Sequence, residues 1–180
     1  GDHAIEIVLN TIEEALSRVP RGNHRHRIEH ASVLNEKTIQ HMKKLDLIAS
    51  VQPHFVVSDF WVAERVGPER ARWVYPFKTL MKEGVTVAGG SDCPVEPINP
   101  LLGIQAAVAR ETFPEERISV GDALRVYTIN AAYASFEDDV KGSIEAGKLA
   151  DLVVLSGNPL TVEPDKIGDI EVKMTVVGGR

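Results

Sequence analysis

The sequence predicts an α/β fold, in which short parallel strands alternate with helices. Three strand-like segments are separated by stretches whose apolar residues recur at helical spacing. The middle segment is apolar almost throughout, which is typical of a parallel sheet covered on both faces. Two of the segments lead to polar residues, His30 and Asp92, at the strand ends where α/β enzymes carry their chemistry. The three segments are His26–His30, Leu47–Val51 and Val85–Ala88.

The first part of the chain is expected to form a helix, a strand, a helix and a strand in that order. Asp2 is expected to cap a first helix that ends at Pro20-Arg21-Gly22. A second helix is expected from about Asn35 to Lys44, between the strands that end at His30 and Val51. Apolar residues at helical spacing support the first helix: Ile5, Val8, Leu9, Ile12, Ala15, Leu16 and Val19.

A long connection follows the middle strand. Residues 53–75 are expected to form this connection and to hold a short helix around Asp59–Arg65. Long loops in compact domains are often functional, so this segment is a candidate lid. Three further helices are expected, near Phe77–Glu83, Leu101–Arg110 and Val120–Asn130.

The pattern changes after Asp139. Gly142–Leu155 is interpreted as a turn followed by two strands, and Ile170–Val177 as one more strand. The chain is therefore divided near residue 140, into an α/β unit of residues 1–140 and a β unit of residues 141–180.

Composition limits the class of protein and of partner. The chain has 180 residues, of which 43% are hydrophobic, enough for one globular domain or part of a larger one. A formal net charge of -6 argues against a nucleic-acid binder, and no apolar run is long enough to cross a membrane, so a small-molecule partner is expected. Cys93 is the only cysteine, which excludes an internal disulfide and favours a reducing compartment such as the cytoplasm.

Three motifs carry a resemblance to a known family. Arg27-Ile28-Glu29-His30-Ala31, Val51-Gln52-Pro53-His54 and Gly90-Ser91-Asp92-Cys93-Pro94-Val95 occur in the order of the closing strands of an amidohydrolase-superfamily barrel. Thr128–Ala132 and Lys141–Leu155 are similar to segments further downstream in that family. Over nearly its whole length the chain resembles the amidohydrolase type 3 group of metal-dependent hydrolases.

The resemblance implies a fold in two parts. Residues 1–140 would be the C-terminal part of a TIM-type (β/α)8 barrel, and residues 141–180 would be strands of a small accessory β-sandwich. The family segment normally begins with His-Ala-x-Gly-Asp, whose His binds metal, whereas this chain begins at Gly1-Asp2. The first-strand His-x-His of the family is also absent. These differences indicate a portion of a larger hydrolase, whose three strands cannot close a barrel alone.

The resemblance also assigns roles to four residues. His30 would bind a divalent metal, and Asp92 would be both a second ligand and the proton shuttle for the attacking water. His54 would contact substrate, and Glu29 would orient an imidazole. Zinc is the expected metal, with iron, manganese or nickel as alternatives, because His and carboxylate ligands suit all four. Such a site needs three or more protein ligands and an open position for water.

Simpler interpretations exist for each residue taken singly. His30 could be a histidine satisfied at a strand end, Asp92 a turn former after two glycines, and His54 a structural residue. His24 and His26 form a His-x-His pair, but their flanking arginines indicate solvated or supporting roles rather than metal ligation.

The implied reaction is hydrolysis of a non-peptide carbon–nitrogen bond, in an amide, a formamide or a cyclic amide, by metal-activated water. The alternative is a non-catalytic binding or regulatory module derived from such an enzyme. A nucleic-acid module built on the basic segment Arg21–Arg27 is disfavoured, because the segment lacks interleaved aromatic residues. The chain alone is expected to be inactive, to bind metal weakly and to form homo-oligomers through its open barrel edge.

Overall fold

The computed structural model describes residues 1–180 and contains a three-stranded parallel sheet and a separate two-stranded antiparallel ribbon. The sheet has the order β1-β2-β3, with β1 at Arg27–Glu29, β2 at Ile48–Val51 and β3 at Thr86–Gly89. Glu29 pairs with Ser50, and Val51 pairs with Gly89. All three strands therefore end at one edge of the sheet, and the prediction of parallel strands is confirmed.

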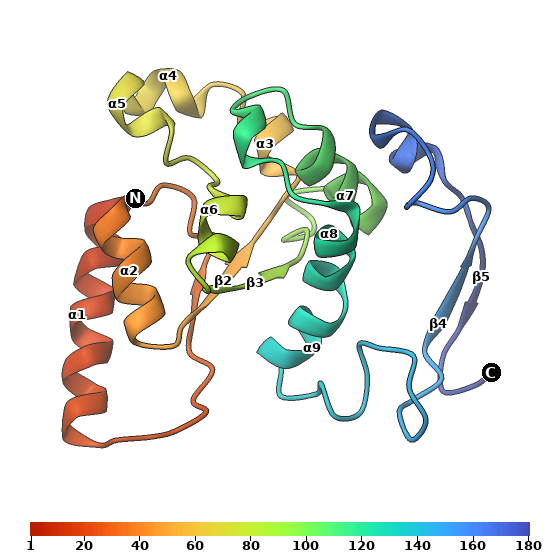
Figure 1. Cartoon of the computed structure of the whole chain (residues 1–180), viewed down its shortest axis with the longest axis horizontal. Coiled ribbons are helices and arrows are strands. Elements are labelled where there is room, and N and C mark those ends of the chain that lie inside the picture. Colours follow the sequence, from red (N-terminus) through yellow and green to blue (C-terminus); the bar gives the residue numbers. More distant parts are fainter.

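Helices surround this sheet. Figure 1 shows α1 and α2 side by side, with α7, α8 and α9 on the other side of the sheet and the β4–β5 ribbon beyond them. The α-helices are α1 (Asp2–Arg18), α2 (Glu36–Lys44), α3 (Phe55–Ser58), α4 (Val62–Val66), α5 (Pro68–Ala71), α6 (Phe77–Lys82), α7 (Pro100–Ala109), α8 (Val120–Tyr127) and α9 (Ile129–Ala134). Two short 3₁₀ helices are η1 (Pro114–Glu116) and η2 (Pro164–Asp169). No helix combines the length and the apolar character needed to cross a membrane.

The middle strand forms the centre of the core. Ile48, Ala49 and Val51 are each at most 1% exposed, although successive residues of a strand face opposite sides of the sheet. Burial on both faces is what a continuously apolar strand requires, so this part of the prediction is also confirmed. The largest side chains buried around the strand are Phe77, Leu9, Leu34, Ile39, Met42, Leu47 and Leu80.

Side-chain caps fix where several helices begin. The Asn35 side chain accepts a hydrogen bond from the Thr38 amide at 2.9 Å, and the Thr38 hydroxyl accepts one from the Asn35 amide, so α2 begins with a reciprocal capping box. Asn99 caps α7 through the Leu101 amide, with Pro100 at the first helical position. Ser119 caps α8. The expected start of the second helix at Asn35 is confirmed.

Two helix predictions near the amino-terminal half are wrong in detail. Gly1, not Asp2, is the N-cap of α1, and the Asp2 carboxylate instead accepts a hydrogen bond from Arg70 at 2.5 Å. The helix expected at Asp59–Arg65 is interrupted, because Asp59 leaves the helical conformation and accepts a hydrogen bond from the Tyr75 hydroxyl at 2.5 Å. Two short helices, α3 and α4, form on either side of it.

The single helix expected at Val120–Asn130 is also divided. Thr128 has φ -122° and ψ -97°, so α8 ends there and α9 begins at Ile129. The side-chain amide of Asn130 donates to the Val87 carbonyl at 2.9 Å, which anchors the new helix on β3. A contact between residues distant in sequence therefore redirects a continuous helical pattern.

The carboxy-terminal segment forms fewer strands than expected. β4 (Leu152–Leu155) and β5 (Val172–Val176) pair antiparallel, but residues 143–150 contain no strand. Ile144 in this stretch is 87% exposed, so it has little contact with the rest of the chain. The two-stranded ribbon is not a sandwich by itself, and the β-sandwich stays a prediction.

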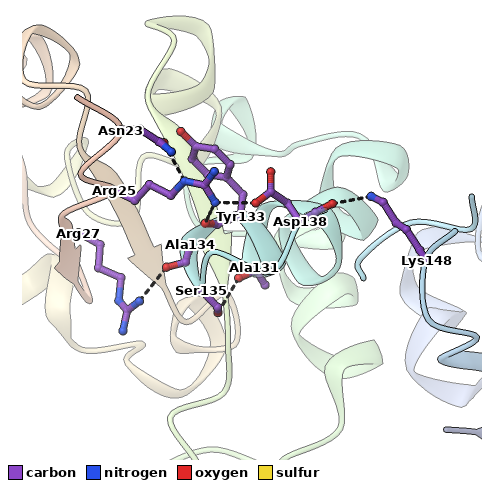
Figure 2. Close-up of polar contacts among 9 residues, drawn as sticks. All are labelled: Asn23, Arg25, Arg27, Ala131, Tyr133, Ala134, Ser135, Asp138 and Lys148. Atoms are coloured by element: carbon purple, nitrogen blue, oxygen red, sulfur yellow. Dashed lines mark hydrogen bonds and ion pairs between the residues drawn. The ribbon is translucent and has the colours of Figure 1, made fainter. Parts of the chain in front are cut away.

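A polar cluster joins the loop before β1 to the end of α9. The Arg25 guanidinium donates to the Tyr133 carbonyl at 2.7 Å and to the Asp138 carboxylate at 2.5 Å, and it lies 3.9 Å from the centre of the Tyr133 ring and 4.6 Å from that of Phe136. Figure 2 shows Arg25 held between Asn23 and Asp138. We call these five residues the Arg25 cluster. Arg25 lies just before β1, at the opposite end of that strand from His30.

Candidate metal and substrate site

The candidate site lies at the carboxyl-terminal ends of the three parallel strands. His30 directly follows β1, Gln52 and His54 follow β2, and Asp92 lies three residues after β3. Since these strands are neighbours, the segments that carry the polar residues leave the sheet side by side. Figure 1 shows β2 leading into α3 at this edge.

His30 is held in a constrained position. Its amide donates to the Ser50 carbonyl at 2.7 Å, which continues the β1–β2 ladder, and its φ of 68° is left-handed, as is that of Ala31 at 44°. A left-handed histidine is uncommon, and such strain gathers at functional sites. The ring Nδ1 lies 2.8 Å from Oε1 of the buried Gln52. With this orientation of the Gln52 amide, whose oxygen only accepts, a neutral His30 ring carries its proton on Nδ1 and leaves Nε2 free for a ligand.

Asp92 also has a left-handed backbone, with φ 56°. Its carbonyl accepts from the Val95 amide at 2.8 Å, and the Ser91 hydroxyl accepts from the Cys93 amide at 3.2 Å, so a local turn fixes the backbone. The Asp92 side chain is exposed and makes no hydrogen bond or ion pair with the chain. Its carboxylate is therefore free to bind a cation or accept a proton.

The glycine that ends β3 has a packing role. A Cβ built on Gly89 would lie 2.6 Å from Cγ1 of Val126 in α8, closer than real contacts allow. Gly89 thus lets α8 approach the strand end from which the Asp92 loop departs. This accounts for the first glycine of the Gly-Gly-Ser-Asp motif without any contact to a ligand.

His54 occupies the N-cap position of α3, and its ring is 23% exposed. Its Nδ1 pairs with the carboxylate of Glu96, a residue only 7% exposed that also accepts a hydrogen bond from the Ser58 hydroxyl. His54 is thus ordered by the loop after β3. Its predicted contact with substrate stays a prediction.

Glu29 lies at the end of β1, and its side chain is 51% exposed. Burial raises the pKa of its carboxyl, but hydrogen bonds from Ser50 and Arg27 outweigh that effect and hold the pKa below its ordinary value. The Glu29 carboxylate accepts a hydrogen bond from Arg27, whereas the His30 imidazole pairs with Gln52. The orienting role expected of Glu29 stays a prediction.

His24 and His26 lie before β1, at the opposite end of that strand from His30. Their rings stack with centres 4.6 Å apart, and the His26 amide donates to Nδ1 of His24 at 3.1 Å. Burial, together with the nearby His24 and Arg21, lowers the pKa of His26. The solvated or supporting role expected of His24 and His26 stays a prediction.

The donors at the sheet edge fit a divalent metal in type but not in number. His30 offers a free imidazole nitrogen and Asp92 a free carboxylate, both of which zinc accepts. No group of three His, Cys, Asp or Glu side chains in the chain is arranged to hold a metal ion. Any metal held by His30 and Asp92 therefore requires further ligands from beyond these residues.

Two hollows are relevant to the site. One, of about 420 Å³, runs along the free edge of β1 against α1, and Glu29 and His30 form part of its wall. A larger one, of about 490 Å³, lies between α9 and β4, and its lining includes Asp151 and the ion pair of Lys141 with Glu137 but no histidine. Only the first hollow is lined by candidate site residues, Glu29 and His30.

Sequence reasoning did not single out Gln52 or Glu96. Gln52 lies inside the Val51–His54 motif, and its position directly after a buried strand is a signal that it faces the same edge as His30. Glu96 lies among exposed residues, and no periodicity marks it as the buried one. Its role depends on a contact 42 residues away in sequence.

Known proteins resemble the chain throughout its length. A model of the amidohydrolase family matches residues 1–180. Putative amidohydrolase YtcJ of Bacillus subtilis (strain 168) is 38% identical over 190 residues, which is 100% of this chain and 35% of that protein. The N-substituted formamide deformylase of Arthrobacter pascens is 34% identical over 187 residues, which is 99% of this chain and 34% of that protein.

A solved structure shares both fold and sequence. The crystal structure of an uncharacterized metal-dependent hydrolase from Pyrococcus furiosus has a TM-score of 0.80 and 38% identity, over 89% of this chain and 33% of that one. The chain thus spans about a third of the length of these relatives. With the family match over all residues and the strand-end motifs in the expected places, the chain belongs to the amidohydrolase family.

Proposed function

We propose that this chain is the C-terminal part of a metal-dependent hydrolase that cleaves a non-peptide carbon–nitrogen bond, in an amide, a formamide or a cyclic amide. The observation that carries the proposal is the pair His30 and Asp92, which follow parallel strands at one sheet edge with a free nitrogen and a free carboxylate. Similarity to an N-substituted formamide deformylase supports the choice of bond.

The chain's own residues have distinct roles in this proposal. His30 and Asp92 are two ligands of a divalent cation, zinc in our proposal, which supplies Lewis acidity and lowers the pKa of water toward neutrality. Gln52 keeps the His30 ring in the tautomer with Nε2 free. The exposed Asp92 carboxylate takes a proton from the attacking water and returns it to the leaving nitrogen. His54 contacts the substrate.

The proposed fold needs more strands than this chain supplies. Residues 1–140 contribute three strands, whereas a barrel needs further strands along the free edges of β1 and β3. Residues 141–180 contribute the β4–β5 ribbon to an accessory β-sandwich. The exposed free thiol of Cys93 supports a reducing compartment, and we place the protein in the cytoplasm.

The test uses the product of the natural reading frame that contains this chain, here called the long form. We expect it to hydrolyse N-substituted formamides or related amides, and Asp92→Asn to lower turnover by about a thousandfold, because one change removes a ligand and a proton acceptor. His3→Gln, an exposed change on α1, is the control and should leave turnover unaltered. Near wild-type turnover of Asp92→Asn would show that Asp92 is a turn residue.

The second candidate is a non-catalytic binding or regulatory module derived from an amidohydrolase, which would need no complete metal site. The two differ in the sequence upstream of Gly1. A His-x-His motif and the histidine three residues before Gly1 would support the hydrolase, and their absence would support the module.

A further inference from the structure

Glu96 is a buried carboxylate in a loop that is otherwise exposed. It is 7% exposed, whereas the four residues from Asp92 to Val95 and the four from Pro97 to Pro100 are all exposed. Removing a carboxylate from water is costly unless hydrogen bonds replace the lost hydration. The burial of Glu96 therefore depends on the hydrogen-bond partners that it has inside the fold.

Both partners of Glu96 belong to the segment that follows β2. One carboxylate oxygen pairs with Nδ1 of His54, and the other accepts from the Ser58 hydroxyl at the end of α3. A carboxylate oxygen accepts, so in a neutral His54 ring the proton lies on Nδ1 and Nε2 is free. Gln52 imposes the same arrangement on His30.

Glu96 is also the tether of the loop that carries Asp92. Within residues 91–98 the other hydrogen bonds are local, from the Cys93 amide to Ser91 and from the Val95 amide to Asp92. The bonds of Glu96 are the ones that reach another element. The position of Asp92 relative to α3 therefore depends on a side chain four residues further along.

We propose that Glu96 is a positioning residue of the candidate site, which fixes His54 with Nε2 presented and holds the Asp92 loop against α3. The consequence for catalysis rests on the proposed function, whereas the positioning itself can be measured on the 180-residue chain without substrate. The two ideas can thus fail separately.

The first experiment records the tautomer of His54 by ¹⁵N NMR of the imidazole, at a pH where the ring is neutral. Wild type should show Nδ1 protonated and Nε2 free. Glu96→Leu should lose this tautomer preference, because it removes the acceptor at similar side-chain length, and Glu96→Gln should restore it through its amide oxygen. Glu13→Leu removes a different Glu–His pair, with His41 on α2, and should leave His54 unchanged.

The second experiment follows hydrogen exchange of the Val95 amide, which reports the turn at Asp92. Glu96→Leu should raise its exchange rate by roughly tenfold or more, because losing hydrogen bonds to a buried charge loosens the loop by at least that factor. Glu13→Leu should not change it. In the long form, Glu96→Gln should retain more turnover than Glu96→Leu.

Two results would overturn the proposal. One is a wild-type His54 with Nε2 protonated, which needs no variant and so does not depend on a variant folding. The other is a folded Glu96→Leu chain whose His54 tautomer and Val95 exchange match those of wild type. If both NMR results are as expected and the long form lacks hydrolase activity, the positioning stands and the proposed function fails.

Discussion

Arg25→Ala should lower the free energy of unfolding of this chain by about 2.5 kcal/mol. The Arg25 side chain is 12% exposed, and it joins the loop before β1 to the segment after α9. The two segments are more than a hundred residues apart in sequence. The substitution therefore removes a link between the two ends of the α/β unit.

The magnitude follows from the contacts that the substitution removes. Hydrogen bonds that involve a charged group contribute about 1.5–3 kcal/mol, and each cation–π contact about 0.5–2 kcal/mol. Asp138 is 30% exposed, so in the variant water can replace part of the hydrogen bonding that Arg25 provided. For this reason we take the lower value for each contribution. Counted together as one charged hydrogen bond, the guanidinium bonds contribute about 1.5 kcal/mol, and the rings of Tyr133 and Phe136 add about 0.5 kcal/mol each, which gives about 2.5 kcal/mol.

Urea unfolding followed by circular dichroism measures this difference. Arg18→Ala is the matched control, because Arg18 pairs with Glu14 on the surface of α1 and should cost less than about 0.5 kcal/mol. Arg25→Lys should fall between, since lysine keeps the charge but loses the planar fork that donates to two acceptors while lying on the rings. If Arg25→Ala costs no more than Arg18→Ala, the cluster does not stabilise the fold and the reasoning is refuted.

Three further predictions concern pH, metal and association. The hydrogen bond from Arg25 lowers the pKa of Asp138 below its ordinary value of 3.8. The stabilisation that this ion pair gives the folded chain is therefore complete above pH 3.8 and is lost as the pH falls through the lower folded-state pKa. Urea unfolding at several pH values should show that the stability difference between wild type and Arg25→Ala shrinks below pH of about 4 and not above it. Calorimetric titration of the 180-residue chain with zinc should show weak or no binding, and a tight stoichiometric site abolished by His30→Ala would contradict this. Light scattering at low micromolar concentration should show self-association, because β1 and β3 have free edges and the ribbon exposes Val153 and Met174, and a monomer with sharp thermal unfolding would be evidence against it.

The sequence was most informative where burial on both faces constrains it. Ile48 and Val51 must be apolar in a central parallel strand, and the helical spacing of Ile5 and Leu9 reflects one buried face of α1. The edge that carries His30 and Asp92 then follows from the parallel direction of the strands. These parts of the fold and site could be predicted because local pattern and tertiary packing agree.

The features that were not predicted depend on contacts between residues distant in sequence, which a local sequence pattern does not reveal. Asp59 interrupts a helix because the Tyr75 hydroxyl reaches it, and Thr128 ends α8 where Asn130 turns to bond β3. Two strands were predicted within Gly142–Leu155, yet residues 143–150 contain none. Glu96 was missed for the same reason, since only the folded chain brings it to His54.

The central claim is that His30 and Asp92 are ligands of one metal ion. Metal analysis of the purified long form tests it most directly, with wild type compared with His30→Ala, Asp92→Asn and the control His3→Gln. We expect wild type and His3→Gln to retain divalent metal in stoichiometric amount, and both site variants to lose most of it while keeping their fold. Equal metal content in all four proteins would contradict the account.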